Sequence, residues 1–199
     1  MKKKLEELQN IFNSPGLTFG IPHAIKIIET LGSEQFLSRK SICELTFVGN
    51  GAIRTLLSKL EKLEIIKTTP LGTTLTENGI NFSKYILNSI PYGKFIDKKI
   101  FPREKNFLII IRGCNNFKNG IEQRDYAIKY GAKNVLSLYY NNGKFFTKRN
   151  SDELENFMSF KKFILKNFSL KNDDVLLITS SDDEFNAELS AKYAAIKSL

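Results

Sequence analysis

The 199-residue chain contains no tryptophan, two cysteines and a single histidine. Cys43 and Cys114 lie far apart and form no CxxC pair, so with His23 as the sole imidazole the sequence argues against a zinc site. Two isolated cysteines are typical of a reducing compartment, and we expect a cytoplasmic protein. No apolar run of about 18 residues occurs, and no apolar signal core follows the basic residues 2–4. The sequence therefore predicts no membrane partner.

In other respects the composition of the chain is that of an ordinary globular protein. Hydrophobic residues form 42% and charged residues 26% of the sequence, which is enough apolar material for a packed core. The net charge is +9, and the first hundred residues carry 14 basic and 9 acidic side chains against 16 and 12 in the remainder. This spread excess of positive charge is compatible with a nucleic-acid partner.

Catalytic groups are scarce. A catalytic site needs a nucleophile, an acid or base, and a stabilising group. His23 follows a proline at a predicted helix start, where a structural role is the simpler interpretation, and Cys114 lies beside Arg112 with no histidine nearby in sequence. The acidic pairs 173–174 and 182–183 fit turns and helix caps better than a metal site. We therefore expect no enzyme, cofactor or metal.

Apolar periodicity in the first half predicts helices and one hairpin. The strongest helix opens at Asn50, and its buried face repeats at spacings of three and four: Ile53, Leu56, Leu57, Leu60 and Leu63. Gly32 is expected to stop an earlier helix, and Ser38 to cap the next. The predicted helices cover 1–13, 22–31, 39–47, 50–63 and 77–90. The predicted strands cover 64–69 and 74–76, joined by a turn at 71–73, with a small strand at 36–37.

The second half predicts the order β-α-β-β-α-β-α. Its strands cover 107–111, 134–140, 144–147 and 175–179, and its helices 119–130, 151–168 and 182–199. Asn141-Asn142-Gly143 is a strong hairpin signal. The first six elements are those of a ferredoxin-like βαββαβ sandwich, here with a terminal helix, whose outer last strand runs antiparallel to the first. We thus expect an α+β fold with a first domain at 1–93, a linker at 94–105 and a second domain at 106–199.

The order of elements between 38 and 90 is that of a winged helix-turn-helix. In this module the second helix of the turn motif lies in the DNA major groove, where arginine reads guanine and asparagine reads adenine. The start of the preceding helix suits a phosphate, and the turn at 71–73 would form the wing. We predict these DNA-binding residues: Ser38, Arg39, Lys40, Asn50, Arg54, Thr55, Ser58, Lys67 and Thr73.

Residues 49–79, GNGAIRTLLSKLEKLEIIKTTPLGTTLTENG, resemble the winged-helix domains of archaeal and bacterial transcriptional regulators. In these a G-x-G-x-[IV]-R-T-x-L-x-x-L helix leads into G-L-[IV] and then L-T-x-x-G. Glu64 stands where those proteins often place glycine, so we expect the strand to begin without a positive-φ cap. The whole chain is also similar to an uncharacterised archaeal family, a winged helix followed by a domain of unknown function, through IIIRGCNNFKNGIEQRDYAIKYGAKNVLSLYYNNGKFF and DDVLLITSSDDEFNAELSAKYAA. That resemblance implies a regulator and transfers no ligand or catalytic residues.

Two polar loops follow strands in the second half. Two arginine side chains and the backbone N–H groups of these loops could together bind the carboxylate or phosphate of a small anionic effector. The candidate ligand-binding residues are Arg112, Asn115, Asn116, Arg124, Ser181 and Asp182. Plain dimerisation through this half, or through the helix at 77–90, is the alternative. The sequence as a whole predicts a homodimeric transcriptional regulator of double-stranded DNA. Two other interpretations are a winged-helix protein–protein interaction module with no specific DNA site and a small-molecule enzyme in the second half.

Overall fold

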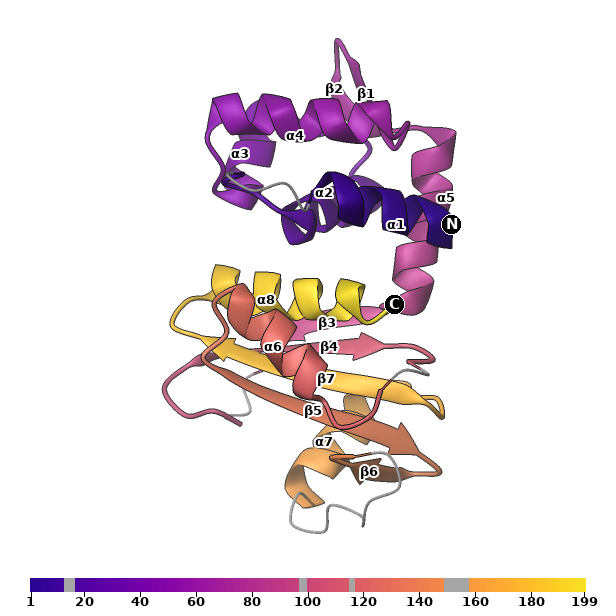
Figure 1. Cartoon of the computed structure of the whole chain (residues 1–199), viewed down its shortest axis with the longest axis vertical. Coiled ribbons are helices and arrows are strands. Elements are labelled where there is room, and N and C mark those ends of the chain that lie inside the picture. Colours follow the sequence, from indigo (N-terminus) through magenta and orange to yellow (C-terminus); the bar gives the residue numbers. More distant parts are fainter. Residues whose placement is uncertain (13–16, 97–99, 115–116, 149–157) are drawn as a thin grey trace. The chain divides into compact units, whose positions relative to one another are not determined.

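The chain divides into two compact units, Met1–Leu87 and Asn88–Leu199, seen in a computed structural model (Figure 1). The structure describes residues 1–12, 17–96, 100–114, 117–148 and 158–199. The predicted end of the first helix at residue 13, the first residues of the helix predicted at 151–168 and the candidate ligands Asn115 and Asn116 lie outside these ranges. No helix within them is long and apolar enough to cross a bilayer.

The first unit is helical with one small hairpin. Its elements are α1 (Lys2–Ile11), α2 (Ile21–Ser33), α3 (Arg39–Thr46), α4 (Asn50–Lys62), β1 (Ile66–Thr69), β2 (Gly72–Leu75) and α5 (Glu77–Ser89). β1 and β2 pair antiparallel, with Ile66 opposite Leu75, and an isolated bridge joins Leu37 to Thr73 beside them. The predicted helices and hairpin are thus confirmed, and the predicted strand at 36–37 is reduced to this bridge.

Apolar spacing explains how the first unit packs. Ile53, Leu56, Leu57 and Leu60 of α4 are all buried, as their spacing predicts. Ser38 caps α3, because its hydroxyl accepts the Ser41 amide at 3.0 Å. The core of the first unit also includes these fully buried side chains from other helices: Leu5, Leu8, Ile25, Ile28, Ile42 and Phe82.

Two glycines are used differently from the prediction. Gly32 lies inside α2 and does not stop it. A Cβ at this position would lie 2.9 Å from Oγ of Ser83 on α5, so glycine here permits close helix packing. Gly72 belongs to β2 with φ 127°, and the turn consists of Pro70 and Leu71. The wing turn predicted at 71–73 is therefore displaced toward the N-terminus.

Glu64 adopts the left-handed conformation that the sequence analysis did not expect there. Its φ is 53°, so β1 is preceded by a positive-φ residue although no glycine is present. The Glu64 carbonyl accepts the Thr76 hydroxyl at 2.5 Å, and its carboxylate accepts the Asn78 amide at 3.3 Å. These contacts hold a conformation that normally favours glycine.

His23 has a structural role at the start of α2. Its Nδ1 accepts the Gly20 amide at 3.1 Å, which closes the first turn of the helix. The side chain is buried, and burial lowers the pKa of the imidazole to about 4. The folded chain therefore binds a proton here less readily than the unfolded chain does.

This pKa difference makes the first unit acid-sensitive. Because the folded pKa is depressed, the stabilising contribution is complete above the unfolded value near 6.5 and is lost as pH falls toward 4. We expect denaturant titrations of wild type to lose about 3 kcal/mol more than His23→Gln between pH 7 and pH 4. Equal losses in the two proteins would show that His23 is not the titrating group.

The second unit is an antiparallel sheet between helices. Its elements are β3 (Tyr92–Phe95), β4 (Lys105–Ile111), α6 (Ile121–Lys129), β5 (Asn134–Asn141), β6 (Lys144–Phe146), α7 (Met158–Asn167), β7 (Asp174–Ser181) and α8 (Glu184–Lys197). The strand order is β3-β4-β7-β5-β6, and every neighbouring pair is antiparallel. α6 and α8 cover one face of this sheet and α7 the other (Figure 1). The hairpin predicted at 141–143 is confirmed, with positive φ at Asn142 and Gly143.

The predicted ferredoxin-like order is wrong, because the last strand lies at the centre of the sheet. β7 is buried at all eight positions and pairs with β4 on one side and β5 on the other. A strand that is buried on both faces favours a central place. β4 and β7 are nevertheless antiparallel, with Ile111 opposite Val175 and Lys105 opposite Ser181. The predicted antiparallel relation of these two strands is thus confirmed, and the loops that follow them lie at opposite ends of the sheet.

The segment expected to link the domains belongs partly to this sheet. β3 pairs with β4 from Tyr92 opposite Ile110 to Phe95 opposite Phe107. Ile96 is buried, and the Asn106 side chain bonds both backbone groups of Phe101 at 3.0 Å. Residues 94–105 resemble a basic linker in sequence, because β3 is a strand only through its pairing with β4, which comes later in the chain.

Candidate nucleic-acid interface

One face of α4 presents polar side chains to solvent. Asn50, Arg54 and Ser58 are spaced by four residues, and Thr55 lies beside them; all four are exposed. The opposite face carries the buried apolar residues of the same helix. Helical periodicity therefore places the four predicted groove contacts together.

Arg54 is available to a partner. Its side chain is exposed and forms no hydrogen bond or ion pair with any residue that the structure describes. Asn50 has its side-chain oxygen engaged by Sγ of Cys43 at 3.5 Å. No atom of the described residues lies within 4 Å of the point that a Cβ would occupy at Gly49 or Gly51, so the backbone at the start of α4 is open to close approach.

The start of α3 carries two exposed cations. Arg39 and Lys40 are the first residues of the helix, where backbone N–H groups lack helical partners. The Ser38 hydroxyl is already engaged by Ser41, so this predicted phosphate contact serves as the helix cap. Lys40 lies 3.9 Å from Glu44 in an exposed pair, which contributes little stability and leaves the ammonium free to exchange partners.

Thr73 is buried and not exposed at the wing as predicted. Its side chain is buried, and its backbone N–H and C=O both bond to Leu37 at 2.9 Å. Thr73 therefore joins the hairpin to the segment before α3 and is withdrawn from phosphate contact. Lys67 is exposed in β1, as a wing contact requires.

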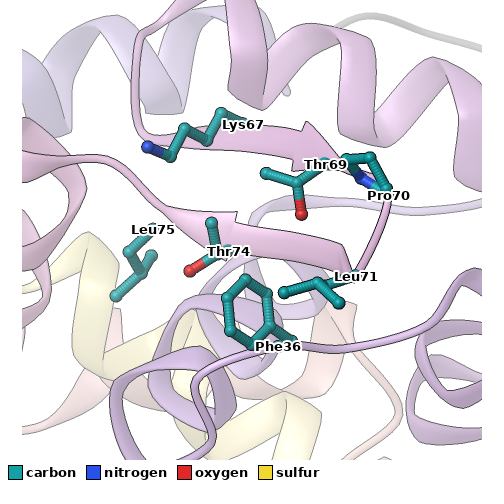
Figure 2. A pocket seen from close by; sticks show the side chains of 7 residues that line it. All are labelled: Phe36, Lys67, Thr69, Pro70, Leu71, Thr74 and Leu75. Atoms are coloured by element: carbon teal, nitrogen blue, oxygen red, sulfur yellow. The ribbon is translucent and has the colours of Figure 1, made fainter.

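An open pocket of about 500 Å³ lies along the hairpin. Its lining comprises Phe36, Lys67, Thr69, Pro70, Leu71, Thr74 and Leu75. Figure 2 shows Phe36 on the same side of the hairpin as Leu71, with Lys67 standing apart on β1. The hairpin thus combines an apolar tip with a single cation.

Two exposed apolar residues were missed by the sequence analysis. Phe47 is 77% exposed and adopts φ 52° in the turn between α3 and α4, and Leu71 is 75% exposed at the hairpin tip. Val48, the residue after Phe47, is buried, so two adjacent apolar residues at the end of a predicted helix were a possible signal that one of them is exposed. Both residues border the exposed polar elements of the first unit.

The structure does not bring together the four candidate ligand residues that it describes in the second unit. Arg112 follows β4, whereas Ser181 and Asp182 lie at the other end of the sheet. Arg124 is exposed on α6 and pairs with the adjacent Asp125 at 3.2 Å. The Ser181 hydroxyl donates to the Gly131 carbonyl at 3.0 Å, and Asp182 accepts the Lys133 ammonium. Among the described residues, no group of three His, Cys, Asp or Glu side chains is placed to hold a metal ion.

Arg112 has an internal partner. Its guanidinium donates to the Asp174 carboxylate and to the Ser169 carbonyl, the latter at 2.7 Å. Burial raises the pKa of Asp174, although the Lys171 amide and Arg112 both act to lower it. The pair thus fastens the end of β4 to the start of β7, and Arg112 is not poised for a soluble anion. Cys114, two residues after Arg112, is buried, and its Sγ lies 3.7 Å from the Ser198 carbonyl oxygen.

Comparisons with known proteins agree with the two-unit division. Residues 33–81 match the family model of the PH0730-like N-terminal domain, and residues 102–199 match that of a domain of unknown function, DUF4443. The structure is similar to that of a hypothetical protein, PH0730, from Pyrococcus horikoshii OT3. The TM-score is 0.70 at 25% identity over 89% of this chain and 91% of that chain. No curated protein matches the chain.

Proposed function

We propose that the first unit is a winged helix-turn-helix that binds double-stranded DNA, and that the protein is a transcriptional regulator. The observation that carries this proposal is the outer face of α4, where Asn50, Arg54, Thr55 and Ser58 are exposed together above an apolar inner face. The order α3, α4, β1, β2, α5 supports it, because this is the arrangement that presents a helix to the major groove.

In the proposed complex α4 enters the major groove. Arg54 donates two hydrogen bonds to a guanine edge, and Asn50 pairs with adenine through its amide. Arg39 and Lys40, at the N-terminal end of α3, hold phosphates together with Lys67 of β1. The phosphate contacts set affinity and register, whereas Arg54 and Asn50 set sequence preference.

Selection of genomic DNA fragments by the full-length protein tests this function. We expect enrichment of fragments that share a common site, with affinity that falls as salt rises. Replacing Arg39 and Lys40 by alanine should weaken binding to all fragments alike and reduce the salt slope by about one for each phosphate contact removed. Lys84→Ala is the matched control, because Lys84 is an exposed cation of the same unit on α5. Recovery of unenriched fragments would contradict the proposal.

A protein-binding module is the second candidate, and the exposure of Phe47 and Leu71 favours it. Aromatic and large apolar side chains are enriched at the centres of protein interfaces. On this account Phe47→Ser and Leu71→Ser abolish binding to a partner protein while Arg54→Ala has no effect. The fragment selection separates the two candidates, because only the first predicts a shared DNA site.

A further inference from the structure

The outward face of α6 carries an ordered set of four exposed residues. Ile121, Arg124, Asp125 and Ile128 follow the spacing i, i+3, i+4, i+7, which places them along one line of the helix. The two isoleucines are 48% and 50% exposed, and the side chains of the charged residues 55% and 62%. The buried residues of this helix, Gln123 and Ala127, lie on its opposite face. We call these four residues the outer face of α6.

The outer face is complementary to itself in the antiparallel direction. The midpoint between Ile121 and Ile128 falls between Arg124 and Asp125. A two-fold axis at that point sets Ile121 against Ile128 of the partner subunit and Arg124 against Asp125 of the partner subunit, each pair occurring twice. Such a repeat of one patch against itself is the requirement of an isologous interface.

The ends of α6 add the same complementarity. Glu122 lies in the first turn and Lys129 in the last, and both are exposed. Antiparallel pairing brings the acidic end of one helix beside the basic end of the other. Lys129 Nζ lies 6.0 Å from the ring centroid of Tyr193, which holds the stem of this side chain along the helix surface.

We propose that the outer face of α6 is the surface through which two copies of this chain pair. The Arg124 guanidinium contacts Asp125 within one chain through Nε at 3.3 Å and Nη2 at 3.2 Å. Pairing exchanges this exposed contact for the equivalent one across the axis while the isoleucines leave water. The inference concerns the second unit alone and holds whether or not α4 binds DNA.

The expected dimer is weak. A nine-residue helix is about 14 Å long, and its outer face buries far less than the roughly 800 Å² per partner of a standard stable interface. The interaction is therefore expected at protein concentrations of about 0.1–1 mM in free solution. Two copies of the chain that also occupy neighbouring DNA half-sites would pair at a higher effective concentration.

Cysteine cross-linking tests the register. In a Cys43→Ser background that retains the buried Cys114, Ile121→Cys protein is mixed with Ile128→Cys protein and oxidised. We expect a disulfide-linked pair from the mixture at about tenfold the yield of Ile121→Cys alone. In the proposed register the two Ile121→Cys positions of a pair would lie about 10 Å apart along the helix axes, which is beyond the reach of a disulfide. Equal yields from the mixture and the single variant would overturn the proposed register.

α5 offers a matched control. Ile80 and Leu87 are also seven residues apart and are 45% and 44% exposed. The residues at their midpoint are Ser83 and Lys84, which supply no opposite charges across a two-fold axis. A mixture of Ile80→Cys and Leu87→Cys should therefore cross-link no more than the background protein. Cross-linking of this mixture at the yield of the α6 pair would show that exposure alone explains the result.

Charge reversal gives a second test by sedimentation of the full-length chain. Arg124→Glu and Asp125→Arg should each weaken self-association about tenfold, because two attractive pairs become repulsive. An equimolar mixture of the two variants should recover wild-type association, since every pair across the axis is again opposite in sign. The recovery also shows that both variants are folded. A wild-type chain that is monomeric at 1 mM, or a mixture that stays monomeric, would contradict the proposal.

Discussion

Alanine at Gly79 should destabilise the first unit by about 3 kcal/mol or more. A Cβ at this position would lie 1.9 Å from the carbonyl oxygen of Ile65 and 2.9 Å from its carbonyl carbon. The obstacle is backbone, and it cannot move freely. The same Ile65 carbonyl accepts the Thr76 amide at 3.0 Å, and the Thr76 hydroxyl accepts the Gly79 amide at 2.9 Å.

Denaturant unfolding of the full chain measures this loss, with hydrogen exchange assigning it to the first unit. Gly51→Ala is the matched control, because Gly51 also lies in a first helical turn but a Cβ there would have no neighbour within 4 Å among the described residues. We expect Gly51→Ala to stabilise the chain by about 0.4–1 kcal/mol. If both alanine variants changed stability by similar amounts, the close approach of Ile65 to Gly79 would not be real.

Breaking the Arg112–Asp174 pair should have an effect of similar size in the second unit. Arg112→Met removes the guanidinium and leaves the fully buried Asp174 carboxylate without its ionic partner. One oxygen of that carboxylate, Oδ1, is buried and forms no hydrogen bond with the residues that the structure describes, even in the wild type. Removing one member of a buried ion pair typically costs about 3–5 kcal/mol, and we expect a loss in this range at pH 7.

The double variant Arg112→Met/Asp174→Val should recover much of that stability. Burial outweighs the ionic partner in setting the pKa of Asp174, so the pair is not strongly favourable as a whole. Valine suits a buried strand position and removes the stranded charge. Denaturant titrations of the two single variants and the double variant complete the cycle. A double variant less stable than Arg112→Met would show that the two groups act independently.

Local patterns predicted the helices, because their buried faces repeat within one segment of chain. The caps at Ser38 and Thr76 were predictable for the same reason, as each bonds an amide three residues away. The close approach of the Ile65 carbonyl to Gly79 explains why the L-T-x-x-G pattern has glycine at its last position. What the sequence did not reveal depends on distant residues: Gly32 packs against Ser83, and β3 forms only by pairing with β4.

The candidate site divides in the same way. The exposed face of α4 was predictable from periodicity, since Arg54 and Ser58 lie opposite Ile53 and Leu60 on one helix. The burial of Thr73 was not predictable, because it arises from pairing with Leu37, far back in the chain. Arg112 likewise appeared available to a ligand only because its partner Asp174 lies 62 residues later.

Affinity of the Arg54→Ala protein for a selected DNA fragment tests the central claim most directly. At fixed salt we expect a loss of about 1–3 kcal/mol relative to wild type, because Arg54 donates to a base edge. Arg54→Lys should recover little, since lysine keeps the charge but not the planar pair of donors. Lys84→Ala should bind as wild type does. Wild-type affinity in Arg54→Ala, with the fold intact by circular dichroism, would contradict groove recognition by α4.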